Sequence, residues 1–505
     1  MITSKYKRPL VSALLLACAL VSPRSLHADY TVTTNKTDNR GVWEGWGTSL
    51  CWWGNLIGGT AYQSKAAQLL GTYNSVDYMG NGTALPGLGL NIIRYNVGGG
   101  GRAGDVSGTP ENISSTLPWH KDIDGYWKNW TSKDITSSSW DWTRDAQQRA
   151  MLIALRDARS SAGLSSLAVE FFHNAPMWWM TPSKSSDGGT LQTWNEGDLA
   201  YYAATVAAYS KAHWGITPVS IEVFNEPSSS WWAYPAGQEG CIIPVAQQAR
   251  VIGALDTALT TAGISGTILA ASDETSVALT TSTYNTLKAT TVNGTLVSNL
   301  IDRVNTHTYS STSASAKQTL RTALGTKKLW MSEYGDSDAT GLKLADQIVS
   351  DMNYLKPTAW IYWQAIEPAA WGLVMATFPS TSTASTRGAP TGVNQKYYVY
   401  AHFTRWIRNG HTLYGTSDQY TVCGYDANNK IMNYVTVNHG TAQKITYDLS
   451  AFTTVTGTTA TIRATQMTAG GTSYVNSTAS IANKTVSIQA GTYTIYTVQV
   501  TGVTP

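Results

Sequence analysis

In VSIEVFNEP (residues 219–227) a short apolar run ends in Asn225-Glu226-Pro227. A second stretch of this kind, KLWMSEYG (residues 328–335), places Glu333 about a hundred residues later. Each run has the length and composition of a buried β-strand, and each delivers a carboxylate where the strand ends. Cleavage of a glycosidic bond needs two such groups: one protonates the leaving oxygen, and the other attacks the sugar carbon or activates water. Glu226 and Glu333 are therefore the candidate catalytic residues.

Six further β-like runs accompany these two stretches, at residues 42–51, 91–97, 167–173, 267–272, 304–309 and 360–365. Segments with helical periodicity separate them, most clearly residues 143–162, 198–213, 244–262 and 341–355. This alternation predicts an α/β fold, a (β/α)8 TIM barrel over residues 41–390. A doubly wound open sheet is the alternative. Its usual Gly-rich phosphate turn is missing, because Gly45-Trp46-Gly47 lacks a third glycine and no Lys-Ser/Thr follows the glycines at 98–101.

The character of the chain changes after Pro390. A predicted amphipathic helix at residues 397–408 precedes segments rich in Thr, Val and Tyr with period-2 alternation, such as residues 431–437 and 493–500. Short alternating strands of this kind predict an appended β-sandwich over residues 391–505. Residues 30–34 alternate in the same way, so we expect residues 29–40 to join that sandwich as an N-terminal strand.

The N-terminus has the features of an export signal. Three basic residues precede the apolar run 10–21, and a small residue, Ala28, precedes Asp29. The run is too short to span a membrane. We therefore expect residues 1–28 to be a cleaved signal peptide and the protein to be secreted, either extracellular or periplasmic. Cleavage leaves three cysteines, which allow at most one internal disulfide: Cys51, Cys241 and Cys423.

Composition narrows the kind of partner. Only 13% of the 505 residues are charged, the net charge is +3, and no Lys/Arg run indicates nucleic-acid binding. The 20 Trp and 27 Tyr far exceed the 6 Phe, which favours surfaces that are half apolar and half wet, such as sugar-stacking clefts. The eight His residues show no zinc-binding spacing. We therefore expect a monomer that binds a polysaccharide or oligosaccharide and needs no metal or organic cofactor.

Six sequence words identify a family resemblance. They occur in the order WEGWGTSL (43–50), LPGLGLNIIRYN (85–96), PMWWM (176–180), FNEPSSSWW (224–232), SEYGDSD (332–338) and WIYWQAI (360–366). Together they resemble glycoside hydrolase family 30, and within it the endo-β-1,6-galactanase branch. The resemblance covers most of the chain after residue 41. It implies a retaining hydrolase that cleaves β-1,6-galactosidic linkages in the galactan side chains of arabinogalactan-type polysaccharides.

The resemblance also implies a role for each site residue. Glu226 would be the general acid/base, which must hold a proton at working pH, and Glu333 the nucleophile, which must be ionised. Asn225 would hold the sugar 2-hydroxyl, a contact that strengthens in the transition state. The complete set of expected substrate-binding residues is Trp52, Arg94, Asn225, His307, Tyr309 and Trp363.

The roles of the other members of this set also make physical sense. Arg94 resembles the arginine that hydrogen-bonds the nucleophile, because a fixed cation favours the carboxylate form; a structural ion pair is the alternative. Tyr309 is similar to the tyrosine that orients the same group. Trp363 resembles the platform beneath the sugar. We expect His307 to support packing or hydrogen bonding, with proton transfer as the alternative.

Other interpretations remain open at this stage. The protein could hydrolyse another β-glycan, such as β-1,6-glucan, xylan or a glucosyl lipid, or it could be a non-catalytic carbohydrate-binding protein. A binder would tolerate loss of either glutamate, yet both are present. Glu170 and Glu367 also lie near predicted strand ends and are competing carboxylates. Adjacent residues on a strand face opposite sides, so at most one of Trp52 and Trp53 should face the cleft.

Overall fold

The barrel predicted from the sequence is present in the computed structural model, which describes residues 29–310 and 313–505. The expected signal peptide, residues 1–28, lies outside the described residues. Eight parallel strands close in chain order, each hydrogen-bonded to the next and the last to the first. They are β2 (Gly45–Ser49), β5 (Ile92–Asn96), β6 (Ala168–Phe172), β8 (Ser220–Glu222), β10 (Ile268–Glu274), β13 (Arg303–His307), β14 (Lys328–Tyr334) and β15 (Ala359–Gln364). The fold-class prediction is confirmed.

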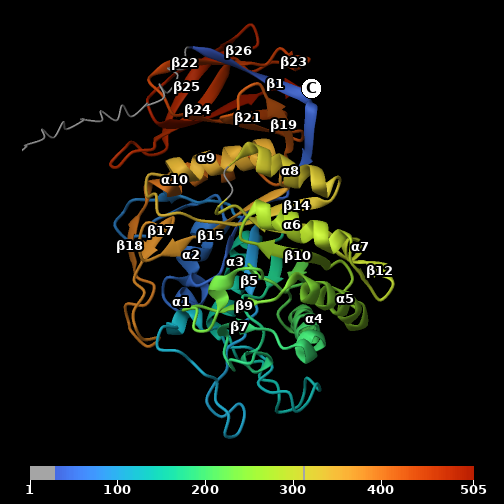
Figure 1. Ribbon diagram of the computed structural model, residues 1–505. Helices are drawn as coiled ribbons and strands as arrows, with labels where there is room; N and C mark the ends of the chain where they lie inside the picture. Colours follow the sequence, from blue (N-terminus) through green and yellow to red (C-terminus); the bar gives the residue numbers. More distant parts are fainter. Residues whose placement is uncertain (1–28, 311–312) are drawn as a thin grey trace, which may run out of the picture.

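Helices between the strands cover the outside of the barrel (Figure 1). The helix predicted over 244–262 is α5, and Gly263 ends it with a φ of 66°, a left-handed conformation that glycine adopts without steric cost. The principal helices are α1 (Trp53–Ile57), α2 (Gln63–Gly71), α3 (Ala146–Ser161), α4 (Glu196–His213), α5 (Val245–Ala262), α6 (Val277–Lys288), α8 (Ala314–Leu324), α9 (Leu342–Ser350) and α10 (Gln395–Thr404).

Two strand boundaries differ from the prediction for identifiable reasons. The strand predicted to begin at residue 42 begins at Gly45, because Val42 is still the last residue of β1 (Tyr30–Val42). The strand predicted to reach Asn225 ends at Glu222, and the chain then turns so that Glu226 has a φ of 47°. Residues 223–225 have no partner in either neighbouring strand, β6 or β10, so the strand stops before them. The carboxylate is thus carried by the loop that follows β8.

The C-terminal part is a β-sandwich closed at both edges. Two strands, β1 and β25 (Val475–Ala482), belong to both of its sheets. The N-terminal strand β1 pairs antiparallel with β19 and parallel with β22. The first described residues therefore lie beside strands from the C-terminal part of the chain. The remaining strands are β19 (Thr412–Thr416), β20 (Thr421–Asp426), β21 (Ile431–Asn438), β22 (Gln443–Asp448), β24 (Thr459–Gln466), β26 (Thr485–Ala490) and β27 (Thr494–Thr501).

The sandwich and the barrel share a buried interface. Figure 1 shows α9 and α10 lying between them. On α10, the buried His402 meets the hydroxyls of Thr465 and Thr497 on the sandwich at 2.9 and 2.7 Å. On the barrel side, the ring of Trp46 packs against Tyr400 and Phe403 of α10. These contacts join the two parts into one structural unit.

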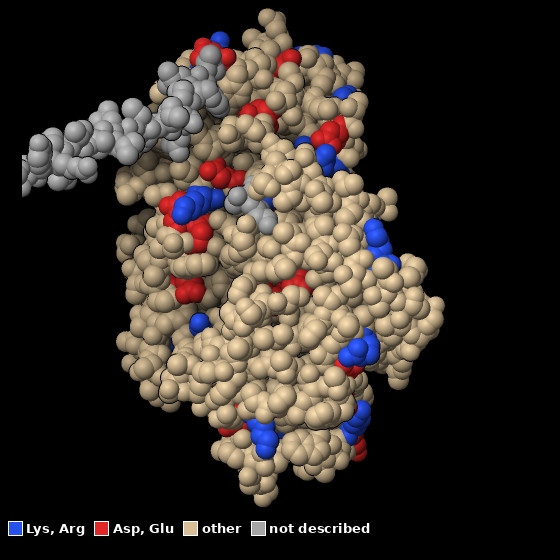
Figure 2. Space-filling model, viewed as in Figure 1, with Lys and Arg blue, Asp and Glu red and all other residues tan. Residues whose placement is uncertain are grey.

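The surface agrees with the composition. Figure 2 shows Lys, Arg, Asp and Glu scattered over one face without a broad patch of either sign. Among the described residues, no helix combines the length and apolar character needed to cross a bilayer. Cys51, Cys241 and Cys423 are buried free thiols.

Candidate active site

Glu226 is held in its left-handed conformation by contacts to its backbone. Its N–H donates to the carbonyl of Asp273, on the neighbouring strand β10, at 2.8 Å. Its carbonyl accepts from the N–H of Ser229 at 2.9 Å and from the indole N–H of Trp232 at 3.1 Å. Non-glycine residues in this conformation are uncommon and cluster at functional sites. The contacts fix where the Glu226 carboxyl group lies.

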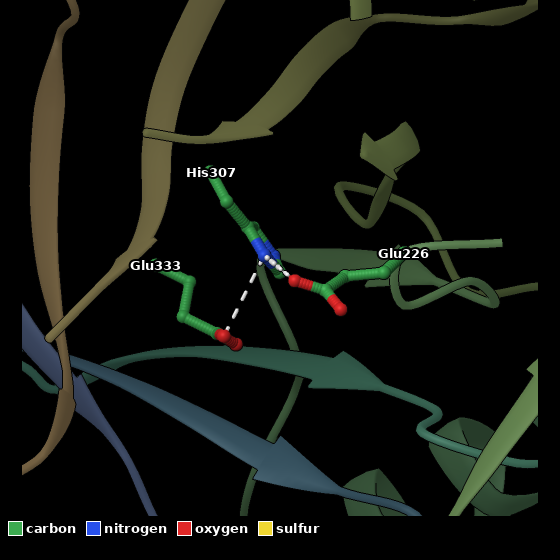
Figure 3. A group of neighbouring side chains, drawn as sticks. All are labelled: Glu226, His307 and Glu333. Carbon is green, nitrogen blue, oxygen red and sulfur yellow. Dashed lines mark hydrogen bonds and ion pairs between the residues drawn. The ribbon is translucent and has the colours of Figure 1, made fainter. Parts of the chain in front are cut away.

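Glu333 lies on β14, and its carboxyl group and that of Glu226 approach the same ring nitrogen of His307 (Figure 3). Tyr309 donates its hydroxyl to Glu333 Oε1 at 2.9 Å. Arg94 Nη1 lies 3.6 Å from the other oxygen, Oε2. The partners that the sequence assigned to the second carboxylate are therefore in contact with it.

His307 bridges the two glutamates. Its Nδ1 lies 3.1 Å from Glu226 Oε1 and 3.5 Å from Glu333 Oε1, and its Nε2 lies 3.3 Å from Asp273. Burial by itself would lower the pKa of His307, but the charges of Glu333 and Asp273 outweigh it and raise the pKa to about 10. The ring is therefore an imidazolium at neutral pH, a cation placed between carboxylates. This placement fits the supporting, hydrogen-bonding role that the sequence predicts for His307.

Arg94 serves more than one carboxylate. Its Nε lies 2.8 Å from Glu170, and its Nη2 is hydrogen-bonded to Asp273. Burial opposes ionisation of Asp273, but Arg94 and His307 together hold its pKa below the usual range. Both interpretations of Arg94 that the sequence left open, a partner of Glu333 and a structural ion pair, therefore apply. Arg94 belongs to a buried ion-pair network, and that network reaches Glu333.

The charge state of Glu333 departs from the expectation of a fully ionised group. Burial raises its pKa to about 7, and repulsion from Glu226 and Asp273 acts in the same direction, against attraction by His307 and Arg94. Two neighbouring carboxyl groups do not both ionise readily, since each charge disfavours the other. Near neutral pH Glu333 is therefore divided between its protonated and its ionised form.

The two glutamates open into a cavity of about 340 Å³ with several aromatic walls. The buried Asn225 lines it, and its Oδ1 has no hydrogen-bond partner among the described residues, so it can accept from a sugar hydroxyl. Trp363 is a half-buried wall. Trp52 lies behind that wall: it is 1% exposed, and its ring meets Trp363 edge-on at 6.1 Å. The structure therefore places Trp52 as support for Trp363.

Binding of a metal ion at this site would require His307 to give up its proton. Within the described ranges, Glu226, His307 and Glu333 are the one group of three potential ligands whose donor atoms lie within 4.8 Å of one another. A metal-binding histidine must be neutral, whereas the carboxylates keep His307 protonated. The imidazolium occupies the place that a cation would take.

The competing carboxylates are engaged elsewhere. Glu170 is fully buried inside the barrel and pairs with Arg94 and Arg303. Glu367 accepts a hydrogen bond from Gln364, and burial raises its pKa to about 7. Neither of the two lines the cavity.

Three functional positions received no role from the sequence. Asp273 lies one residue past the predicted strand 267–272, so the rule that barrel enzymes use strand ends could have found it. Trp231, one of an adjacent pair with Trp232, donates its indole N–H to Glu226 Oε2 at 3.0 Å. Trp371 lines the cavity from the loop after β15, and no local pattern marks it.

The site contains paired carboxyl groups at the carboxyl ends of barrel strands, in a cavity lined by Trp side chains. This arrangement is typical of enzymes that cleave glycosidic bonds. By fold and site the molecule is a glycoside hydrolase. The profile of "O-Glycosyl hydrolase family 30" matches residues 29–374. An endo-beta-1,6-galactanase from Hypocrea rufa is 39% identical over 466 residues, 91% of each chain. The chain belongs to glycoside hydrolase family 30.

More distant relatives agree with this membership. An exo-beta-1,6-galactobiohydrolase from Bifidobacterium longum subsp. longum is 26% identical over 78% of this chain and 31% of its own length. Among solved structures, a conserved exported protein from Bacteroides fragilis superposes with a TM-score of 0.73 at 18% identity, covering 93% of this chain and 100% of that one. The catalytic domain of the GH30 xylanase C from Talaromyces cellulolyticus gives 0.68 at 17% identity, covering 94% and 100%. At these identities the structures show the fold alone.

Proposed function

We propose that this glycoside hydrolase cleaves β-1,6-galactosidic linkages within galactan side chains of arabinogalactan-type polysaccharides. The proposed substrate rests on the 39% identity to an endo-beta-1,6-galactanase over 91% of both chains. The second curated relative, an exo-beta-1,6-galactobiohydrolase, bears a name with the same linkage. Attack within the chain, rather than from its end, follows the more similar relative.

In this proposal Glu226 is the general acid/base and Glu333 the nucleophile. Glu226 protonates the leaving glycosidic oxygen while Glu333 attacks the anomeric carbon, and Glu226 then activates the water that releases the sugar. His307 and Arg94 offset the charge of Glu333, and Tyr309 orients it. Asn225 holds the 2-hydroxyl, and the ring of Trp363 packs against the apolar face of the galactose.

The spacing of the carboxyl groups supports retention of the anomeric configuration. An oxygen of Glu226 lies within 4.8 Å of an oxygen of Glu333. Retaining pairs are separated by about 5–5.5 Å, whereas inverting pairs are about 6.5–9.5 Å apart to make room for a water molecule. The observed spacing is closer to that of a retaining pair. Two inversions at one carbon then restore the original anomer.

A substrate screen tests the proposal. Purified protein is incubated with β-1,6-galactan, β-1,6-glucan and xylan, and the products are sized over time. We expect galactan to be cleaved, with oligosaccharides of mixed length appearing early. Release of a single short product would instead indicate exo attack. Preferential cleavage of glucan or xylan would assign the enzyme to another glycan, and no cleavage of any β-glycan would favour a carbohydrate-binding role.

We also propose that the protein is secreted and acts as a monomer. The basic residues, apolar run and small residue at positions 1–28 support export. N-terminal sequencing of protein from the culture medium should begin at Asp29. Size-exclusion chromatography with light scattering should give the mass of a single chain.

A further inference from the structure

Two tryptophans on the wall of the catalytic cavity expose much of their surface. Trp231 is 53% exposed and Trp371 is 41% exposed, and both line the cavity that contains Glu226 and Glu333. An apolar ring left uncovered inside a cavity marks a surface that a ligand covers. The proposed function assigns a sugar to Trp363 but leaves these two rings without one.

Trp371 belongs to the part of the cavity wall that carries Glu333. Gly335 follows Glu333 by two residues, and a Cβ added there would lie 3.2 Å from the ring of Trp371 and 3.4 Å from Cβ of Trp363. The hydroxyl of Tyr362 donates to the carbonyl oxygen of Trp371. Trp363 and Trp371 therefore form one wall, next to the sugar whose anomeric carbon Glu333 attacks.

Trp231 belongs to the part of the wall that is tied to Glu226. It lies in the short helix η4 (Ser230–Trp232) and donates its indole N–H to Glu226 Oε2 at 3.0 Å. Its neighbour Trp232 is 4% exposed and donates to the backbone carbonyl of Glu226 at 3.1 Å. The rings of Trp231 and Trp232 meet edge-on at 6.4 Å. The buried indole thus fixes η4 to Glu226, while more than half of the Trp231 surface stays uncovered.

The contact with Glu226 places Trp231 next to the leaving group. A general acid must come within about 2.6–3.2 Å of the oxygen that it protonates, so the atoms joined to that oxygen lie beside the residues around the Glu226 carboxyl group. Oε1 of Glu226 faces His307, which is fully buried, whereas Oε2 points away from that ring and meets Trp231 (Figure 3). The sugar on the leaving-group side therefore meets Trp231 rather than His307.

The β-1,6 linkage gives the leaving sugar a particular geometry. Its glycosidic oxygen is bonded to C6, a methylene carbon outside the ring, whereas in a 1,3 or 1,4 linkage the oxygen is bonded to a ring carbon. The ring of a 6-linked sugar therefore starts one carbon further from the acid. The narrow methylene group passes the indole edge that is bound to Oε2, and the ring beyond it reaches the indole face. A ring carbon in the place of the methylene group would press its substituents against that edge.

We propose that Trp231 forms the subsite for the sugar on the leaving-group side, as a platform for its ring, and favours a sugar joined through its 6-hydroxyl. This inference rests on the proposed function, in which Glu226 is the acid/base and Glu333 the nucleophile. The same subsite binds an acceptor sugar when the glycosyl-enzyme reacts by transfer instead of hydrolysis. In that step the acceptor's 6-hydroxyl gives its proton to Glu226 and its oxygen bonds to the anomeric carbon. The bond from that carbon to Glu333 breaks, and Glu333 leaves as a carboxylate.

The ratio of transfer to hydrolysis tests the platform. The donor is β-1,6-galactobiosyl fluoride, whose leaving group has no ring, and the acceptor is methyl β-galactoside. Glu226 activates water and sugar alike, so a general defect in acid/base catalysis cancels in this ratio. In W231A the ratio should fall by about tenfold, the effect of losing contact with the apolar area of about two methylene groups. W231F keeps a ring and should retain most of the transfer. No fall in W231A, or an equal fall in W231F, overturns the proposal.

Methanol as acceptor is the matched control, because it has a primary hydroxyl but no ring. Its ratio of transfer to hydrolysis should be the same in W231A as in the wild type, and an equal fall for both acceptors would mean a structural role and would overturn the proposal. W194A should match the wild type with both acceptors, because Trp194 is 74% exposed but does not line the cavity. Proton NMR of the transfer product should show the new bond at O6. Equal transfer to the secondary hydroxyls would overturn the assigned preference for a 6-linked sugar.

Failure of this inference is distinguishable from failure of the proposed function. If the wild type cleaves another glycan in the screen, donor and acceptor are made from that sugar and the platform is tested in the same way. If the wild type inverts the anomer, the role of Glu333 falls and this inference falls with it. If the wild type retains the anomer, kcat/KM on galactan oligosaccharides relative to the fluoride gives a second measure, which should also fall by about tenfold in W231A. A W231A variant with the wild-type ratio in both measures refutes the role of Trp231 alone.

Discussion

Replacing His307 by glutamine should move the acidic limb of the pH profile upward. The imidazolium of His307 lies 3.5 Å from Glu333 and opposes the burial that raises the pKa of Glu333 to about 7. Glutamine can keep a hydrogen bond but removes the positive charge. Glu333 would then hold its proton to still higher pH. A protonated carboxyl group cannot attack the sugar, so activity should begin to rise only at a higher pH.

The size of the shift follows from the geometry. Two unit charges 3.5 Å apart attract by about 5 kcal/mol at an effective dielectric constant of about 20, equivalent to about 3.5 pH units. This is an upper bound, because His307 is shared with Asp273 and Glu226 and Arg94 still lies near Glu333. We expect the limb to rise from near pH 7 by about 1–3 units.

The assay should isolate ionisation of the nucleophile. With a dinitrophenyl β-1,6-galactobioside the leaving group needs no proton, so the acidic limb of kcat/KM reports Glu333 alone. His402 provides a control: it is also fully buried, but its pKa is lowered to about 3 by burial, so it is neutral. H402Q should reduce stability without moving the limb. An unmoved or lowered limb in H307Q would refute the electrostatic role assigned to His307.

Five further results are expected. E333Q should form no glycosyl-enzyme detectable by mass spectrometry. The activity of E226A on galactan should fall by about 10²–10⁴-fold, whereas its activity on the dinitrophenyl substrate should be kept. Azide should accelerate turnover of that substrate by E226A. A variant that does not respond to azide would argue against the acid/base role of Glu226. Proton NMR of the first-formed sugar should show the retained anomer, and the opposite anomer would exclude Glu333 as nucleophile. Deleting residues 29–42 should lower Tm by circular dichroism, because β1 pairs with both sandwich sheets; an unchanged Tm would contradict that role. Dialysis against a chelator should leave activity intact, whereas loss that a metal restores would point to a cation in the site.

Much of the molecule could be predicted because its signals are local. The runs around Glu226 and Glu333 are short, apolar and bounded, and a barrel strand needs no more than that to be recognised. The rule that barrel enzymes carry their working groups at strand ends then connects two residues far apart in the chain. The same rule applies to Asp273, one residue beyond a predicted strand end.

Other features depend on which side chains meet in space. The sequence word FNEPSSSWW contains Trp231 and Trp232 but does not show how they differ. Trp231 hydrogen-bonds the carboxyl group of Glu226, and Trp232 hydrogen-bonds its backbone carbonyl. We expected Trp52 to contact the substrate, whereas in the structure it lies behind Trp363. The Trp52–Trp363 contact joins two distant segments, and the contacts of Trp231 and Trp232 depend on how their own loop folds back on Glu226. No sequence periodicity encodes either kind of contact.

The eight-stranded barrel, the sandwich and the two catalytic candidates were predictable from the sequence, because strand periodicity and strand-end positions are properties of neighbouring residues. The charge state of the site was not predictable in this way. The pKa of Glu333 near 7 and that of His307 near 10 arise from burial and from charges on five different strands and loops. Electrostatic energy depends on distance and on exclusion of water, and both exist only once the chain has folded.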